Sequence, residues 1–282
     1  MSVELHQVAP GVRRLALRTP TLPPATHTNT WLLGDRELVV IDPASPWEDE
    51  QARLVAVLDD ALAQGARVAA ILLTHHHHDH VGGAVALQRA LAVRGVDVPV
   101  LGHAVNADWL PDGVQLDAEL AEGQHVPCDV GEYVAVHTPG HAPGHLVLHD
   151  PRTGRMVAGD MVAGVGTILI GPDDGHLGTY LDSLARMQEL GGELLLPAHG
   201  DPIPSGQTML SFYIAHRHQR SQQIMDGLLA LGPATEAELA ARIYRELPEA
   251  ALPLAALQVR AHLRWLDEQG LARPDGTRWR RA

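Results

Sequence analysis

The sequence contains no lysine and only one cysteine, and these two shortages exclude several classes of protein. Cys128 alone cannot form an internal disulfide framework or a site made of paired cysteines. No apolar run approaches the roughly 18 residues that a membrane-spanning helix needs, so we expect no membrane segment. The first residues show no basic flank followed by an apolar core. We therefore expect no secretory signal and a cytoplasmic location.

The charge is acidic and unevenly distributed. The formal net charge of the 282 residues is −13. Residues 1–207 hold 11 arginines and 26 acidic residues, whereas residues 208–282 hold 10 arginines and 8 acidic residues. An acidic body is poorly suited to follow a phosphate backbone, which needs several cationic contacts. We therefore do not expect DNA as a partner, but the near-neutral C-terminal part leaves RNA open.

Strand-like and helical patterns alternate along the first 200 residues, which predicts a mixed α/β domain with strands buried between helical layers. The predicted helices are residues 48–63, 81–93 and 178–190. The predicted strands are residues 12–18, 29–34, 37–42, 68–74, 98–102, 133–138, 145–150, 155–160 and 193–197.

The C-terminal part has a different pattern. The turn-rich segment 201–206 predicts a boundary, with one domain over residues 1–206 and a second over residues 207–282. The second domain begins with a predicted helix over 207–231. A capping box at residues 235–238 opens the next helix, and a third runs over 254–268. The turn at residues 274–277 predicts a hairpin. This order is typical of a winged-helix module; a plain helical cap is the alternative.

Histidine is abundant, with 18 residues, and five of them lie in the run THHHHDHVGG at residues 74–83. This run lies between the most apolar predicted strand and a predicted helix, which is no place for a purification tag. In an extended loop, His75 and His77 point the same way. Asp79 and His80 then lie at the helix N-terminus and address a second point. The spacing predicts a metal site, and we expect the intervening His76 and His78 to face elsewhere.

Three later fragments can complete this site, because each follows a predicted strand. TPGH ends in His141, which offers a third imidazole to a first metal. GD ends in Asp160, whose carboxylate could bridge two ions. PAHG contains His199, which offers an imidazole to a second metal. Neutral imidazoles and carboxylates suit Zn²⁺, although Fe and Mn also accept this ligand set.

The ordered set HxHxDH, TPGH, GD and PxHG resembles the metallo-β-lactamase superfamily over about residues 10–205. The resemblance implies an αββα sandwich with two metal ions at one edge. It implies His75, His77 and His141 at the first metal, and Asp79, His80 and His199 at the second, with Asp160 bridging. Histidine at position 77 disfavours a redox di-iron site, because the related flavodiiron proteins typically have glutamate there.

A narrower resemblance covers nearly the whole chain. The segments TNTWLLG (28–34) and PAHGDPI (197–203), with Ala215-His216-Arg217, Arg220 and the run QQIM (222–225), are similar to the lactamase-beta-2-like branch. That branch carries a C-terminal winged-helix module. Its members include a single-strand-specific endoribonuclease and relatives that act on acyl thioesters. The resemblance therefore implies metal-dependent hydrolysis but does not imply a particular substrate.

The primary hypothesis is a hydrolase with two Zn²⁺ ions, in which a hydroxide bridging the metals attacks a small ester, thioester or lactone. Asp79 could orient this hydroxide. A bound water, His145 or Tyr180 could pass a proton to the leaving group, although His145 and Tyr180 also fit structural roles.

Other activities remain as alternatives to this hypothesis. The first is a metal-dependent endoribonuclease acting on single-stranded RNA, for which the tail offers Arg273, Arg278, Arg280 and Arg281 around Trp279. A second is a winged-helix regulator, which the few cations of residues 254–268 disfavour. The absence of a basic C-terminal cluster argues against glyoxalase II, and the absence of a secretory signal argues against an exported β-lactamase.

Overall fold

The computed structural model describes residues 4–282 and divides into two compact units. The first unit comprises Met1–Thr138, Pro143–Ile168 and Glu189–Gln207. The second comprises Pro139–Ala142, Leu169–Gln188 and Thr208–Ala282. Each unit has a hydrophobic core of its own. Because the second unit includes two short earlier segments, the domain boundary after residue 206 stays a prediction.

A seven-stranded sheet in the first unit has its strands in chain order. The strands are β1 (His6–Ala9), β2 (Val12–Arg18), β3 (His27–Leu33), β4 (Glu37–Ile41), β5 (Arg67–Leu72), β6 (Val100–Gly102) and β7 (Ala118–Glu119). Strands β1 to β4 pair antiparallel, and β4 to β7 pair parallel. Because β4 and β5 are parallel neighbours, the residues that follow Ile41 and Leu72 emerge at the same edge of the sheet.

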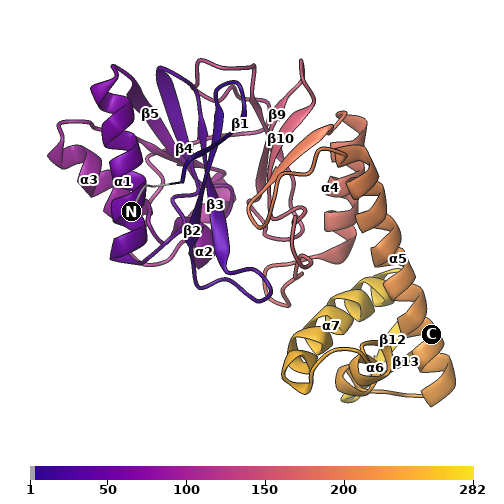
Figure 1. Cartoon of the computed structure of the whole chain (residues 1–282). Helices are drawn as coiled ribbons and strands as arrows, with labels where there is room; N and C mark the ends of the chain where they lie inside the picture. The colour runs from indigo at the N-terminus through magenta and orange to yellow at the C-terminus, as the bar shows by residue number, and fades with distance from the viewer. Residues whose placement is uncertain (1–3) are drawn as a thin grey trace. The chain divides into compact units, whose positions relative to one another are not determined.

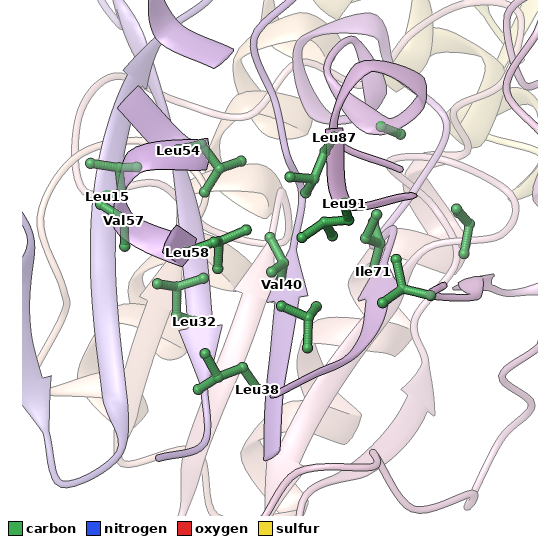
Figure 2. Close-up of a cluster of buried hydrophobic side chains, with 14 of the residues drawn as sticks. Leu15, Leu32, Leu38, Val40, Leu54, Val57, Leu58, Ile71, Leu87 and Leu91 are labelled. Atoms are coloured by element: carbon green, nitrogen blue, oxygen red, sulfur yellow. The ribbon is translucent and has the colours of Figure 1, made fainter. Parts of the chain in front are cut away.

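Helices α1 (Glu48–Ala63) and α3 (Ala84–Val93) cover one face of this sheet (Figure 1). Figure 2 shows leucines such as Leu58 of α1 and Leu91 of α3 close to Val40 of the sheet, all in one buried cluster. Their spacing on the helices is what the apolar periodicity predicts. Each fully buried leucine contributes about 1.5–3 kcal/mol of transfer free energy, so this layer fixes the helices on the sheet.

The other face of the first sheet packs against a second, four-stranded sheet, with strand order β11-β10-β9-β8. These strands are β8 (Val134–His137), β9 (Leu146–Asp150), β10 (Arg155–Gly159) and β11 (Leu194–Pro197). Strand β11 pairs parallel with β10. Trp31 and Ile41 of the first sheet share a buried cluster with Leu146 and Leu196 of the second. This cluster is the core between the two sheets.

The helix predicted over residues 81–93 is instead two helices, a short α2 (His78–Val81) and α3, separated by Gly82 and Gly83. A Cβ atom on Gly83 would overlap the carbonyl oxygen of Pro43, so the loop after β4 packs directly on the glycine backbone. The single-helix prediction is wrong because apolar periodicity does not register this close approach.

The second unit contains most of α4 and α5 and all of the C-terminal elements. These elements are α4 (Leu177–Glu189), α5 (Gly206–Leu231), α6 (Glu236–Ile243), α7 (Leu252–Glu268), β12 (Ala272–Asp275) and β13 (Arg278–Arg281). The predicted capping box is confirmed: Glu238 N–H donates to Thr235 Oγ1 at 3.2 Å, and Thr235 N–H donates to Glu238 Oε2 at 2.7 Å. Ile224 of α5 and Leu263 of α7 belong to its core. Among residues 4–282, we find no helix with both the length and the apolar character needed to cross a membrane.

Inside this unit, His262 of α7 is 1% exposed, and its Nδ1 lies 2.8 Å from Ser221 Oγ of α5. Burial lowers the pKa of His262 well below its usual value, and the positive charges of Arg217 and Arg220 lower it further. The folded unit therefore holds His262 neutral at a pH where an exposed histidine would be protonated.

We expect this histidine to make the second unit less stable in acid. The unfolded chain binds a proton at His262 near pH 6.5 and the folded chain does not, so the free energy of unfolding falls as pH drops below about 6.5. The slope is up to about 1.4 kcal/mol per pH unit. Urea unfolding at pH 7.5 and 5.5, compared between the wild type and His262→Gln, measures this contribution. An equal loss in wild type and His262→Gln would contradict the prediction.

Candidate metal centre

The histidine run begins where the chain leaves β5. Strand β5 ends at Leu72, and α2 begins at His78 with His77 as its extended N-cap residue. The alternation of the extended segment brings His75 and His77 together: Nε2 of His75 lies 2.9 Å from Nδ1 of His77. His78 is exposed. His76 is buried, and its ring centroid lies 5.3 Å from that of Trp109. His76 and His78, the two histidines that alternate with the predicted ligands, therefore differ in burial.

Two further groups of side chains overlap this pair. The ligand atoms of Asp79, His80 and His199 lie within 4.8 Å of one another, and so do those of His75, His80 and Asp160. Asp79 and His80 come from α2, Asp160 follows β10 and His199 follows β11. The first unit therefore brings together all of the predicted ligands except His141. That they bind metal stays a prediction.

Asp42 directly follows β4, and its carboxylate contacts both Thr74 and His80. Its Oδ1 accepts the backbone N–H of Thr74 at 2.8 Å, and its Oδ2 accepts the Thr74 hydroxyl at 2.7 Å. The same Oδ2 lies 2.9 Å from Nδ1 of His80. The backbone φ of Asp42 is 51°, a conformation that few residues other than glycine adopt and that tends to occur at functional sites.

Sequence reasoning missed Asp42, although a signal exists. It is an acidic residue at the end of a buried strand, directly before Pro43. Many strands end in such a residue, so the pattern does not separate Asp42 from an ordinary turn residue. Its role depends on the pairing of β4 with β5, which brings Asp42 next to Thr74.

Thr74 and Asp42 set the proton positions on two candidate ligands. The Thr74 hydroxyl donates to Asp42, so Thr74 Oγ1 can accept the Nδ1 proton of His75 at 3.1 Å. Asp42 Oδ2 accepts the Nδ1 proton of His80. Both rings then carry the lone pair on Nε2, which is the form that binds a metal. Nε2 of His80 is buried and has no hydrogen-bond partner within the described part of the chain.

In His199 and His141 a backbone carbonyl oxygen likewise fixes the proton on Nδ1. Nδ1 of His199 donates to the carbonyl oxygen of His27 at 3.0 Å. Within the second unit, Nδ1 of His141 donates to the carbonyl oxygen of Leu169 at 2.9 Å. Outer partners of this kind orient the imidazole ligands of metal sites. The donor set therefore fits a metal ion in both ligand type and tautomer.

Comparison with known proteins identifies the family. A sequence profile described as the Metallo-beta-lactamase superfamily matches residues 23–199. The chain belongs to this superfamily. A second profile, for the Beta-lactamase associated winged helix domain, matches residues 235–279. The predicted fold, an αββα metallo-β-lactamase sandwich followed by a winged-helix domain, is thereby confirmed, and the protein is a hydrolase of this fold.

Individual relatives agree with this placement. The chain is 32% identical over 260 residues to the Beta-lactamase-like protein 2 homolog of Drosophila melanogaster, covering 87% of this chain and 84% of that protein. It is 30% identical over 261 residues to the Atrochrysone carboxyl ACP thioesterase of Aspergillus fumigatus, covering 87% and 77%. The crystal structure of a beta-lactamase domain protein from Burkholderia ambifaria superposes with a TM-score of 0.84 at 24% identity, covering 99% and 94%.

The charges of this metallo-β-lactamase site stabilise one another. Burial lowers the pKa of His80, but the carboxylates of Asp160, Asp42 and Asp79 outweigh burial and raise that pKa well above its usual value. Burial raises the pKa of Asp160, yet His199 and His80 hold it well below its usual value. The carboxylate is therefore charged at neutral pH. A metal ion on Nε2 of His80 would displace the proton that these carboxylates favour on that ring.

His145, predicted as a proton donor, is fully buried and directly precedes β9. Its Nε2 accepts the backbone N–H of Asp160 at 3.0 Å, and its Nδ1 lies 2.9 Å from Thr138 Oγ1. A Cβ atom on Gly159 would crowd the same imidazole, so Gly159 makes room for it. These contacts favour a positioning role for His145, which holds the backbone of Asp160.

His141 and Tyr180 belong to the second unit. His141 lies in the turn Pro139–Ala142, where Gly140 has a φ of 129° and a Cβ atom would overlap the backbone of Tyr180. Tyr180 is fully buried, and the guanidinium of Arg217 lies 5.3 Å from its ring centroid. These contacts favour a packing role for Tyr180. That His141 joins His75 and His77 at one metal stays a prediction.

Two of the four tail arginines form ion pairs within the second unit. Arg278 pairs with Glu238 at 2.6 Å, and Arg280 lies 3.9 Å from Asp275. Trp279 is half-buried against the core, with its indole N–H 3.3 Å from Glu236. These contacts favour a structural role for this segment over phosphate and base binding.

Proposed function

We propose that the protein hydrolyses a small ester, thioester or lactone with two Zn²⁺ ions. The observation that carries this proposal is the pair of overlapping histidine and aspartate groups, whose outer partners select the metal-binding tautomers. In this proposal His75, His77 and His141 would hold one ion, and Asp79, His80 and His199 would hold the other, with the carboxylate of Asp160 available to both.

The chemistry divides between the ions and the chain. When bound, the two Zn²⁺ ions supply a water of lowered pKa and a Lewis acid for the substrate oxygen. The Asp79 carboxylate is partly exposed, with Oδ2 3.5 Å from Nε2 of His199. We assign Asp79 the role of accepting a hydrogen bond from the attacking water and orienting it. His145 holds the Asp160 backbone and so maintains the position of that carboxylate.

Three arguments support a small acyl substrate over RNA. Relatives named as thioesterases align with most of the chain. Residues 1–207, which include the whole of the first unit, carry a strong excess of acidic residues, and a polyanion would be repelled by it. Arg278 and Arg280 form ion pairs with acidic residues, so they are less available to bind the phosphates of an RNA.

A substrate panel with the zinc-loaded protein tests the proposal. The panel contains acetyl and longer acyl thioesters of N-acetylcysteamine, p-nitrophenyl esters, lactones and a fluorescent single-stranded RNA. Metal content is measured on the same samples. We expect zinc-dependent hydrolysis of at least one acyl substrate, lost in Asp160→Asn. Cleavage of RNA alone by a protein holding two metal ions would overturn the proposal in favour of the endoribonuclease.

A further inference from the structure

An exposed aromatic side chain lies next to the candidate metal ligands. Trp109 is 41% exposed, and its ring centroid lies 5.3 Å from that of His76. The ring of His76 in turn lies 4.6 Å from that of His77. Trp109 is therefore one ring away from a proposed ligand of the first metal. The position of Trp109 beside a proposed metal ligand, rather than its exposure alone, places the indole where a bound substrate can contact it.

The loop that carries Trp109 is held in place. It contains the short helix η1 (Ala104–Asp108), and the backbone N–H of Trp109 donates to the carbonyl oxygen of Asn106 at 2.9 Å. Asn106 is fully buried, and its side-chain amide donates to the carbonyl oxygen of Gly144 at 3.0 Å. A Cβ atom on Gly144 would overlap the Asn106 amide, so the two backbones fit closely. The indole is thus presented on a rigid support, which lowers the entropic cost of binding a partner.

A second exposed apolar side chain belongs to the loop that pairs with the backbone of His199. Val165 is 37% exposed, on a loop where Gly164 N–H donates to the carbonyl oxygen of His199 at 2.7 Å. The rings of His75 and His80 are 4.0 Å apart, and those of His80 and His199 are 5.6 Å apart. Trp109 and Val165 therefore belong to two different loops, one next to His76 and the other next to His199.

The charges around Trp109 indicate what it binds. Residues 95–151, which include the whole loop, contain no arginine or lysine, and Asp108 directly precedes the indole. Stacking of a nucleobase on Trp109 would bring its phosphates next to a loop that supplies acidic residues and no cationic side chain. A neutral apolar group meets no such penalty.

We propose that Trp109 is a specificity-determining residue that packs against the apolar acyl group of the substrate, with Val165 as a second apolar contact. This inference rests on the proposed function and extends it to a substrate class: esters or thioesters of long or aromatic acyl groups. Acetyl substrates, which do not reach the indole, gain nothing from it.

The test compares kcat/KM for acetyl and decanoyl thioesters of the same thiol. In the wild type we expect a preference for decanoyl, and in Trp109→Ala that preference falls by about tenfold or more, because apolar contacts of a few methylenes are worth at least that factor. Acetyl hydrolysis stays within about threefold of the wild type. Trp109→Phe retains most of the preference. Trp47→Ala is the matched control, since Trp47 is 42% exposed and lies over Arg18.

A binding measurement separates this inference from the proposed function. Calorimetry of a decanoyl thioether analogue with metal-free protein reports the acyl contact even if no acyl substrate is hydrolysed. Weaker binding to Trp109→Ala but not to Trp47→Ala supports the inference. Equal binding to both variants, an equal loss of acetyl and decanoyl hydrolysis, or a wild type without chain-length preference overturns it. A Trp109→Ala effect on RNA cleavage alone would assign the indole to base stacking and also overturn it.

Discussion

Replacing His77 by alanine is expected to lower kcat/KM by at least about 100-fold and to reduce the zinc content of the protein. Even outer partners of metal ligands are typically worth 10- to 100-fold in metal affinity or activity, and a direct ligand is worth more. The His77 side chain faces Nε2 of His75 at 2.9 Å and takes no part in either core cluster of the first unit. The sandwich should therefore stay folded. Zinc analysis, circular dichroism and the thioester assay together check the prediction.

The neighbouring histidines provide matched controls for this experiment. His78→Ala removes an exposed imidazole at a skipped position and should leave zinc content and activity unchanged. His76→Ala removes a buried ring that contacts Trp109, so we expect a small loss of stability with the zinc content retained. Loss of zinc in His76→Ala or His78→Ala, as large as in His77→Ala, would show that alternation along the extended segment does not select the ligands.

Replacing Asp42 by asparagine is expected to weaken zinc binding by about 10- to 100-fold without removing any proposed ligand. Asparagine has one acceptor oxygen in place of two. If that oxygen keeps the Thr74 N–H, the amide NH₂ faces His80 and donates to its Nδ1. The proton of His80 then moves to Nε2, which is the nitrogen that the metal needs. A change at the outer carboxylate thus acts through the tautomer of the ligand.

A chromogenic chelator competition measures this loss of zinc affinity, and urea unfolding measures the accompanying loss of stability. In Asp42→Asn the buried hydroxyl of Thr74 loses the oxygen to which it donates, which lowers the free energy of unfolding by about 1–3 kcal/mol. Asp129→Asn is the matched control, because Asp129 likewise accepts two backbone N–H groups, from Asp35 and Arg36, in an exposed loop. We expect this control to lose stability with its zinc affinity unchanged. Equal zinc affinity in Asp42→Asn and wild type would rule out control of the His80 tautomer by Asp42.

Several elements follow from local chemistry alone. Strand β2 and helix α1 have the predicted bounds, because their apolar spacing matches a single period from end to end. The capping box at Thr235 is present because its two hydrogen bonds join residues three positions apart. The sequence does not predict the short strands β1 and β7, since two to four residues carry too little periodicity to be distinguished from loops.

In the candidate site, too, the features that depend on neighbouring residues are predicted from the sequence and those that depend on distant residues are not. The alternation of His75 and His77 and the position of Asp79 and His80 at the start of a helix depend on neighbouring residues, and the sequence predicts both. The contact between His145 and the Asp160 backbone spans 15 residues, so the sequence leaves His145 with two competing roles. The approach of Pro43 to Gly83, which divides the predicted helix, likewise depends on a distant loop.

By itself, the sequence determined which residue types were available for metal chemistry and the order in which they follow the strands. Only the tertiary structure decided which acceptor controls each imidazole. Asp42 meets His80 because β4 and β5 pair in parallel, and His199 meets the carbonyl of His27 across 172 residues. Such contacts arise from the packing of separate strands, whose free energy comes mostly from the apolar cores. No local pattern therefore encodes them.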